Sequence, residues 1–450
     1  GTLSCGSGRC WGCNAILIAS VAETDELLDN VEKWSGSAIR QCQCPGAGIL
    51  GKFSKVTHMW NSSSELMAKS PYDVVIVGGG TAGIATAISA ARRDMSVCLV
   101  EQTSMLGGMG TSGMMTAIIA PKKHFGGVGV EIVDRLRQRE GVPPNNSPGN
   151  YGWVPYHNET MKRLLDDLIL DSGVDLYLCT KLIGVQRSKN TLQGITVAGP
   201  DGNWGIRGSV FVDATGDGAL SCYAGEDFEL GDEQGNTQAP SMTAYYSHID
   251  FDRFSAFVVS EGGNYTEIVH RLLPIAVQDG ILSSVDLHHP GVFRIQKDVA
   301  IVNVGHVYGA DCASAKGLTM ATIAGRKLAT EYIAFYRRYI PGFENAVMTN
   351  TASWLGIRET RRIKGKYMLS HEDKANYRKF DDAVFRFGGG AKTDMHASTN
   401  SREDYLDYYR RFTSVEKRRD DDYCSFPYRS LVTGKNDNLY VLESTEFSAV

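Results

Sequence analysis

The stretch Tyr72–Glu101, YDVVIVGGGTAGIATAISAARRDMSVCLVE, constrains the fold of this chain more than any other segment. Val74–Val77 is a short apolar, β-branched run, typical of a strand buried on both faces of a parallel sheet. Gly78, Gly80 and Gly83 then occupy the three glycine positions of G-x-G-x-x-G. The first glycine permits a tight turn, the second lets backbone approach a pyrophosphate, and the third lets helix and strand pack closely. The segment therefore predicts a dinucleotide-binding βαβ unit.

The rest of this unit indicates which dinucleotide it holds. Ile84–Ala91 predicts a helix whose N-terminal amides and dipole face the phosphates. Val97–Val100 predicts the second strand, and Glu101 follows it, 101 − 83 = 18 residues after Gly83. A carboxylate at this position accepts hydrogen bonds from ribose hydroxyls and repels a 2′-phosphate, which argues against NADP. NAD and FAD both remain open at this point.

Two further segments favour FAD over NAD. The loop Leu106–Gly113, LGGMGTSG, has four glycines and can wrap its backbone around the phosphates and ring of a flavin, which a nicotinamide dehydrogenase does not require. Val210–Val212 predicts an apolar strand that leads into Ala214, Thr215 and Gly216, where backbone can pass close to a bound nucleotide. This strand returns the chain to the first βαβ unit after a long excursion. NAD then remains only as a transient electron donor.

Composition excludes several other classes of protein. The chain has 450 residues, 42% hydrophobic and 22% charged, as in a globular protein of two or three domains. The net charge is −5 without a sustained basic block, so nucleic-acid binding is not expected. Glycines and charges interrupt every apolar stretch, so no transmembrane segment is expected either. No signal peptide is recognisable, which favours a cytoplasmic location. Hydrolase and NTPase motifs are missing from the sequence.

The cysteines are unevenly distributed. Half of the ten fall in the first 44 residues, at Cys5, Cys10, Cys13, Cys42 and Cys44. Thiolates grouped in this way can hold an iron–sulfur cluster or zinc, and in an exported protein they can pair as disulfides. They can also be incidental. Their spacing matches no ligand framework closely, so we assign no metal ligands.

Shorter patterns predict the remaining elements. Apolar periodicity predicts two helices, at Met161–Leu170 and Leu318–Tyr339. It also predicts a strand at Val174–Leu178. A hairpin is expected from Gly184–Gln186 and Gly194–Ala198, with its turn at Lys189-Asn190. Residues 222 to about 310 are mixed in character and suit an inserted substrate domain.

Seven motifs, in order, carry a resemblance to a known family. GGGTAGIATAISAA, EQTSMLGGMGTSG, HNETMKRLLDDLILDSGVDLYL, VFVDATGDG, RRYIPGFENA, GIRETRRIKGKYMLSHED and FPYRSLVTGKNDNLYV resemble the FAD-dependent oxidoreductase family. That family includes the flavin subunit of heterodisulfide reductases and is akin to fumarate reductase flavoproteins. The resemblance implies an α/β fold of the glutathione-reductase type, in which a Rossmann-like FAD-binding domain with a parallel sheet is interrupted by an inserted α+β substrate domain. It also implies that FAD is lined by Gly78, Gly80, Gly83, Glu101, Gly107, Gly108, Ala214, Thr215 and Gly216.

The expected domain organisation begins outside this resemblance, because residues 1–70 are expected to form a cysteine-containing segment of unknown fold. Residues 71–221 are expected to form the first part of the FAD-binding domain, and residues 222–350 the substrate or cap domain. Residues 351–450 form a helical segment and return to the FAD domain. Family members continue after the strand that corresponds to Asn438–Val441 into a glycine turn and a helix near the flavin ring. Here LESTEF follows Asn438–Val441, so this FAD-side motif is expected to be missing.

Candidate catalytic residues come from two segments. If GIRETRRI is a helix, Arg358, Arg361 and Arg362 share one face, and their guanidinium groups can clamp a substrate carboxylate or stabilise negative charge on reduced flavin. The alternative is a charged helix face paired with Glu359. His396 is a second candidate, as a proton donor or acceptor near neutral pH.

The expected function is an FAD-dependent oxidoreductase that transfers hydride between the flavin and a small organic substrate, with an unidentified electron donor or acceptor. Two alternatives remain open. One is a flavin and iron–sulfur electron-transfer subunit that uses the early cysteines. The other is a truncated relative that keeps the fold without catalysis.

Overall fold

The computed structural model describes ten parts of the chain, all within one compact unit, Ser63–Val450. They are residues 71–118, 126–143, 154–232, 235–286, 288, 291–370, 372–373, 376–388, 397–406 and 423–442. The five early cysteines, His396 and the residues after 442 lie outside these parts. The expectations placed on them therefore stay predictions.

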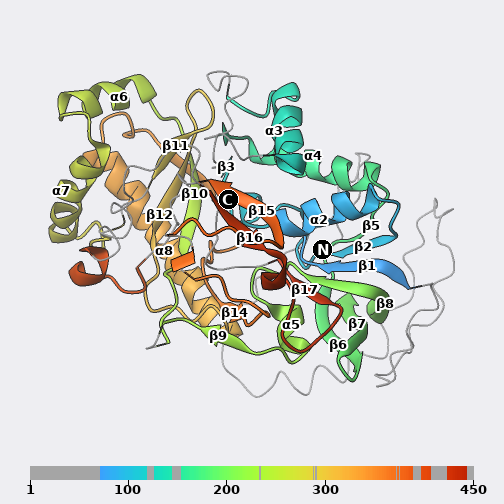
Figure 1. The fold of residues 1–450 in the computed structure, drawn as a ribbon. Coiled ribbons are helices and arrows are strands. Elements are labelled where there is room, and N and C mark those ends of the chain that lie inside the picture. The colour runs from blue at the N-terminus through green and yellow to red at the C-terminus, as the bar shows by residue number, and fades with distance from the viewer. Residues whose placement is uncertain are drawn as a thin grey trace, which may run out of the picture. The chain divides into compact units, whose positions relative to one another are not determined.

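The first large feature is a mainly parallel sheet (Figure 1). Four of its strands lie in the order β5-β2-β1-β8, and β17 also pairs with β8. These are β1 Tyr72–Val77, β2 Val97–Val100, β5 Asp175–Tyr177, β8 Gly202–Asp213 and β17 Leu439–Val441. Because β1 and β8 pair in parallel, the expected return of the chain to the first βαβ unit is confirmed. β8 begins earlier than expected because its first half pairs antiparallel with β7, Thr191–Gly199, which in turn pairs with β6, Lys181–Ser188.

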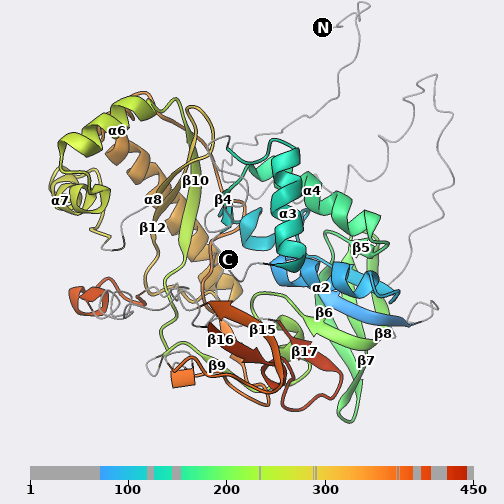
Figure 2. The ribbon, with the colours of Figure 1, turned by 45° about the horizontal axis from the view of Figure 1, so that its top comes forward.

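Alternate residues of β1 support two different hydrophobic layers. Val74 and Ile76 pack with the residues of three helices, α2 Thr81–Ala91, α3 Gly127–Gln138 and α4 Asn158–Asp171. Figure 2 shows these three helices grouped on one side of the sheet. Val75 and Val77 point to the other face and pack with β6, β7 and the short helix α5, Ala219–Tyr223. Successive side chains of a strand point to opposite faces, so the continuous apolar run in the sequence covers both faces of a buried sheet.

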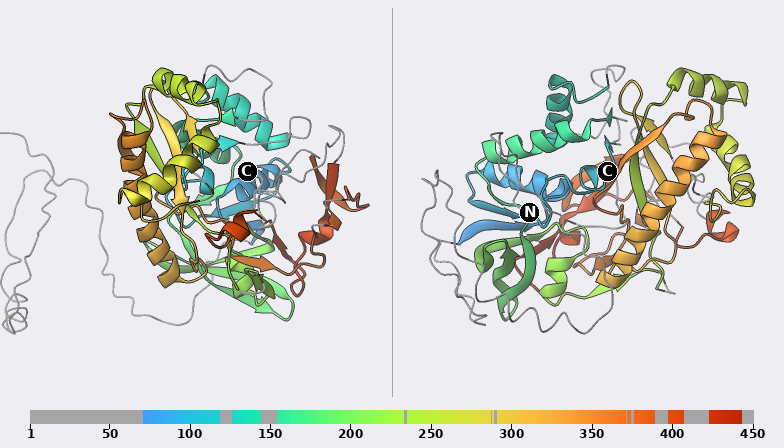
Figure 3. Two further views of the ribbon diagram at one scale, coloured as in Figure 1. Left: turned by 90° about the vertical axis from the view of Figure 1, so that its left-hand side faces the viewer. Right: turned by 180° about the vertical axis from the view of Figure 1, so that it is seen from behind.

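The second large feature is an antiparallel sheet of four strands in the order β11-β12-β10-β13. Its strands are β10 Ser241–Ser247, β11 Val292–Arg294, β12 Ala300–His306 and β13 Val347–Thr351. The long helix α8, Ala315–Tyr339, packs along this sheet (Figure 3). Helices α6, Phe251–Ser260, and α7, Tyr265–Gln278, contribute to the same hydrophobic core. The observed mixed α/β fold with a mainly parallel central sheet agrees with the expected fold class.

Three short strand pairs complete the described architecture: β3 Ala117–Ile118 with β4 Val154–Pro155, β9 Phe228–Leu230 with β14 Arg361–Ile363, and β15 Ala383–Gly388 with β16 Tyr423–Pro427. The β9–β14 pair shows that the helix expected for GIRETRRI is wrong. Arg361 and Arg362 pair with Leu230 and Glu229 in an antiparallel ladder. Because neighbouring strand residues point to opposite faces, these two arginines cannot act together as one helical face.

Most other expected elements are confirmed with shifted ends. The hairpin turns at Lys189-Asn190, since Ser188 and Thr191 are cross-strand partners. The two expected helices are α4 and α8, each of which begins three residues earlier than its apolar pattern. Among the described residues, no helix is both long and apolar enough to cross a membrane.

Candidate functional site

A cavity of about 690 Å³ lies at the carboxyl ends of β1, β2 and β8. Open α/β sheets bind ligands at this edge, outside the ends of their parallel strands. Of the nine residues expected to bind FAD, the structure brings eight together around this space: Gly78, Gly80, Glu101, Gly107, Gly108, Ala214, Thr215 and Gly216. Gly83 lies outside the lining.

The three motif glycines serve different purposes in the structure. Gly78 has φ +106°, and a Cβ added there would lie 2.0 Å from the Ala214 carbonyl oxygen. A Cβ at Gly83 would lie 1.9 Å from the Gly78 carbonyl oxygen, so Gly83 lets α2 pack against the turn. A Cβ at Gly80 would meet no protein atom within 4 Å. Gly80 therefore faces open cavity, as a glycine that admits a ligand should.

Glu101 is fixed by the backbone of its neighbours. It is buried, and its two carboxylate oxygens accept hydrogen bonds from the amides of Gly79 at 2.6 Å and Thr103 at 2.7 Å. A carboxylate has about four lone-pair positions, so each oxygen retains acceptor capacity. The carboxylate is thus held rigidly at the cavity wall and can still accept hydrogen bonds from a ligand.

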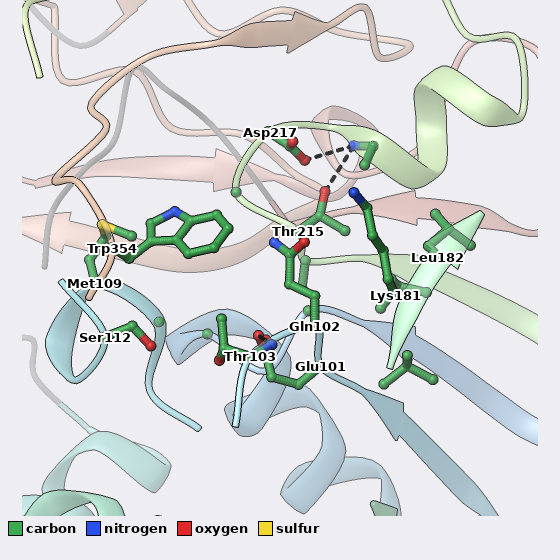
Figure 4. Close-up of a pocket in the computed structure, with 18 of the residues that line it drawn as sticks. Glu101, Gln102, Thr103, Met109, Ser112, Lys181, Leu182, Thr215, Asp217 and Trp354 are labelled. Carbon is green, nitrogen blue, oxygen red and sulfur yellow. Dashed lines mark hydrogen bonds between the residues drawn. The ribbon is translucent and has the colours of Figure 1, made fainter. Parts of the chain in front are cut away.

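A buried acid that sequence reasoning did not single out shapes the opposite wall. Asp213 accepts hydrogen bonds from the Thr215 hydroxyl at 2.7 Å and the Ser221 amide at 2.7 Å. Burial raises the pKa of Asp213, and the hydrogen bonds from Ser221 and Thr215 oppose that increase. The Ala219 amide at the start of α5 donates to the Thr215 hydroxyl oxygen and to Asp217 (Figure 4). The sequence could have indicated this role, because Asp213 ends an apolar strand directly before Ala214-Thr215-Gly216.

Side chains from distant segments also line the cavity. Met109, Trp354 and Arg361 are among them, and no spacing in the sequence connected them. In Figure 4, Trp354 and Met109 lie at the end opposite Lys181 and Leu182. The Arg361 guanidinium donates to the carbonyl oxygens of Asp217 at 3.0 Å and Ala313 at 3.2 Å. Carbonyl oxygens do not neutralise the guanidinium, and the Asp217 carboxylate lies 3.9 Å from it. Arg361 therefore adds a cation to the cavity lining, whereas Met109 and Trp354 add apolar surface.

The other two expected arginines are placed elsewhere. Arg358 donates to the Ala239 carbonyl and the Ser241 hydroxyl, both at 3.0 Å, and does not line the cavity. Arg362 pairs with Glu359 and Glu229. Only Arg361 of the three reaches the cavity.

A buried polar cluster lies at the end of β12. Asp286 accepts hydrogen bonds from the Tyr308 hydroxyl at 2.9 Å and the His288 amide at 3.0 Å, and it lies 3.0 Å from His306 Nδ1. Burial alone would raise the pKa of Asp286, but the His306 pair and these hydrogen bonds hold it well below its usual range. Burial raises the pKa of Tyr308 far above its usual range, and the neighbouring Asp286 charge adds to the shift. The sequence contains no pattern that connects these residues.

The residues around the cavity fit FAD. The Ser112 hydroxyl is buried and has no hydrogen-bond partner among the described residues, so it offers a polar contact for a ligand. Gly80 and Gly216 both line the cavity, and a Cβ at either would enter open space. The N-terminus of α2 begins beside Gly80 and presents amides without helical acceptors, which suits a pyrophosphate. Within the described part of the chain, no group of three or more potential metal ligands is found.

Comparisons with known proteins agree with this geometry. A family model described as FAD dependent oxidoreductase matches residues 73–449. Among curated proteins, digeranylgeranylglycerophospholipid reductase 1 of Methanococcoides burtonii is 24% identical over 199 residues, which cover 42% of this chain and 48% of that protein. The chain thus spans about half the length of this curated relative.

Two solved structures illustrate the structural likeness. A geranylgeranyl bacteriochlorophyll reductase-like protein from Thermoplasma acidophilum aligns with a TM-score of 0.40 and 14% identity, covering 64% of this chain and 67% of that chain. The p-nitrophenol 4-monooxygenase of Pseudomonas putida DLL-E4 aligns with a TM-score of 0.41 and 13% identity, covering 66% of this chain and 70% of that chain.

Proposed function

The chain belongs to the FAD-dependent oxidoreductase family, and from this premise we propose that it transfers a hydride between FAD and a small organic molecule. Bound FAD accepts or supplies the electron pair, and the protein contributes binding, orientation and electrostatics. The observation that carries the proposal is one continuous cavity lined by the glycine-rich turn, Glu101, Ala214–Gly216 and Arg361.

In this proposal the backbone and one carboxylate hold the ADP half of the cofactor. Gly78 and Gly80 let the chain approach the pyrophosphate, and the N-terminal amides of α2 face its negative charge. Glu101 accepts hydrogen bonds from ribose hydroxyls with the acceptor capacity that Gly79 and Thr103 leave. Gly107, Gly108 and Ala214–Gly216 line the same space.

The other end of the cavity surrounds the redox reaction. Arg361, which lines the same cavity, supplies a fixed positive charge that favours an anionic ring or an anionic substrate group. Met109 and Trp354 contribute apolar surface at this end. Residues 222–350 are proposed to cover the substrate, and residues 351–450 to return to the FAD domain. The proposed substrate is a small molecule. The electron donor or acceptor is not identified.

The proposal is tested by an absorbance spectrum of the purified protein, before and after denaturation, with chromatography of the released cofactor. Flavin absorption and released FAD are expected. A Gly80→Val variant should retain its fold and lose most of its FAD, because the new side chain enters the cavity. Gly184→Ala is the matched control, since its Cβ would make only ordinary contact with Thr196 at 3.8 Å in the β6–β7 hairpin. A folded protein that neither contains nor takes up FAD would contradict the proposal.

A further inference from the structure

Trp354 occupies a position that the proposed ADP contacts do not explain. It lines the cavity, and Figure 4 shows its indole beside Met109 at the end away from Lys181. Trp354 follows β13, so it belongs in sequence to the second sheet, whereas Met109 belongs to the glycine loop after β2. The two side chains therefore meet only because the two sheets share this cavity.

The backbone around Trp354 is held from both directions. The Ser112 carbonyl oxygen accepts hydrogen bonds from the Trp354 amide at 3.1 Å and from the Ser353 hydroxyl at 3.2 Å. The next side chain, Leu355, is buried in the hydrophobic core of the second sheet. The backbone that carries the indole is thus held to the glycine loop on one side and to the second core on the other. Because this backbone is already fixed, it loses little conformational entropy when a ligand binds beside the indole.

The direction of the dinucleotide assigns a ligand group to this end. Glu101 fixes the ribose position, and Gly78 with Gly80 fixes the pyrophosphate position. The ring of FAD lies beyond the pyrophosphate from the adenosine, so it must extend away from Glu101. Trp354, Met109 and Ser112 form the end of the cavity in that direction. A flat aromatic ring gains from contact with another aromatic side chain beyond the effect of buried area alone.

We propose that Trp354 is a positioning residue for the redox-active ring of FAD, which its indole contacts directly. The inference rests on the proposed binding of FAD. It adds that the second sheet contributes the aromatic contact, and that the half of FAD beyond the pyrophosphate is recognised by a side chain of this sheet.

The experiment uses tryptophan fluorescence of the full chain, freed of flavin and titrated with FAD or with ADP as the probe. In the wild-type protein FAD should quench emission, whereas ADP should bind without this quenching because it lacks the ring. In Trp354→Phe most of the FAD-dependent quenching should disappear. Trp204→Phe is the matched control, because Trp204 lies in β8 against Tyr177 and does not line the cavity. That variant should retain the quenching.

Affinity gives a second readout. Trp354→Leu should weaken FAD binding by roughly three- to tenfold, the range expected for loss of one aromatic contact, and should leave ADP binding unchanged. Trp354→Phe should restore most of the affinity. If FAD binds, by flavin absorbance, but quenching and affinity are the same in wild type and both Trp354 variants, the positioning role is wrong while FAD binding stands. If the wild type takes up no FAD at all, both proposals are overturned.

Discussion

The two ends of the cavity are built on different principles. At the adenosine end, a single stretch of chain supplies backbone amides, glycines and one carboxylate, Gly78 to Glu101. At the other end, side chains arrive from distant segments, represented by Met109 and Trp354. The first design depends on glycines at fixed spacing and on very short backbone distances. The second depends on how two sheets pack. Mutation of the tight turn at Gly78 should therefore act on folding, whereas mutation of Trp354 should act on ligand binding.

The largest effect is expected at Gly78. Ala at this position combines a left-handed φ of +106° with a Cβ 2.0 Å from the Ala214 carbonyl oxygen. Gly78→Ala should lower the free energy of unfolding by more than about 3 kcal/mol, measured by urea denaturation. Gly80→Ala is the control, because its Cβ would contact no protein atom within 4 Å. Equal stability of the two variants would show that the turn is not held by the close approach of β8.

The second-largest effect on stability is expected from replacing Asp286, a buried acid near the second sheet. Asp286→Asn should lower the free energy of unfolding by about 3 kcal/mol near neutral pH, because it removes a buried carboxylate that accepts hydrogen bonds from the His288 and His306 amides and the Tyr308 hydroxyl. The folded pKa of Asp286 is lowered, so its stabilisation is complete above the ordinary carboxyl pKa of about 3.9 and is lost as the pH falls below it. The difference between wild type and variant should therefore shrink in acid.

The matched control for this buried charge is Asp171→Asn. Asp171 is an exposed acid at the end of α4, and its replacement should change stability by less than about 0.5 kcal/mol at either pH. Urea denaturation at several pH values distinguishes the two variants. A pH-independent loss in Asp286→Asn would indicate a packing effect rather than loss of the buried carboxylate.

A smaller effect is expected on the flavin rather than on the fold. Arg361→Met removes a cation from the cavity lining and should lower the reduction potential of bound FAD by about 30 mV, since an added negative charge is then less stabilised. Dye-equilibration potentiometry measures this shift. Arg358→Met should leave the potential unchanged, because Arg358 does not line the cavity. If Arg358→Met lowers the potential and Arg361→Met does not, Arg358 rather than Arg361 is the cation that acts on the flavin.

The smallest effect is expected at an exposed ion pair on the helices that cover the parallel sheet. Arg92 and Glu131 form two hydrogen bonds of 2.8 and 2.9 Å between α2 and α3, but Arg92 remains 46% exposed. Arg92→Met should cost less than about 1 kcal/mol and lose its effect at high salt. Arg93→Met, on an exposed neighbour, is the control in the same urea experiment. A cost as large as that of Asp286→Asn would contradict the contrast between exposed and buried pairs.

Local patterns predicted much of the fold and one end of the site. The glycine motif, the hairpin at Lys189-Asn190 and the two long amphipathic helices each depend on residues close together in sequence. The GIRETRRI helix was wrong for the opposite reason. Arg361–Ile363 pairs with Phe228–Leu230, which lies far away in the chain, and this tertiary pairing overrides a local helical spacing.

The sequence by itself determined the βαβ unit, its glycine-lined turn and the acid after its second strand. Each is required by backbone geometry that only particular residue types permit. The tertiary structure alone decided that Arg361 rather than Arg358 reaches the cavity, that Trp354 meets the glycine loop through Ser112, and that Asp286 is buried against His306. These contacts join segments separated by tens to hundreds of residues, and no local spacing encodes them.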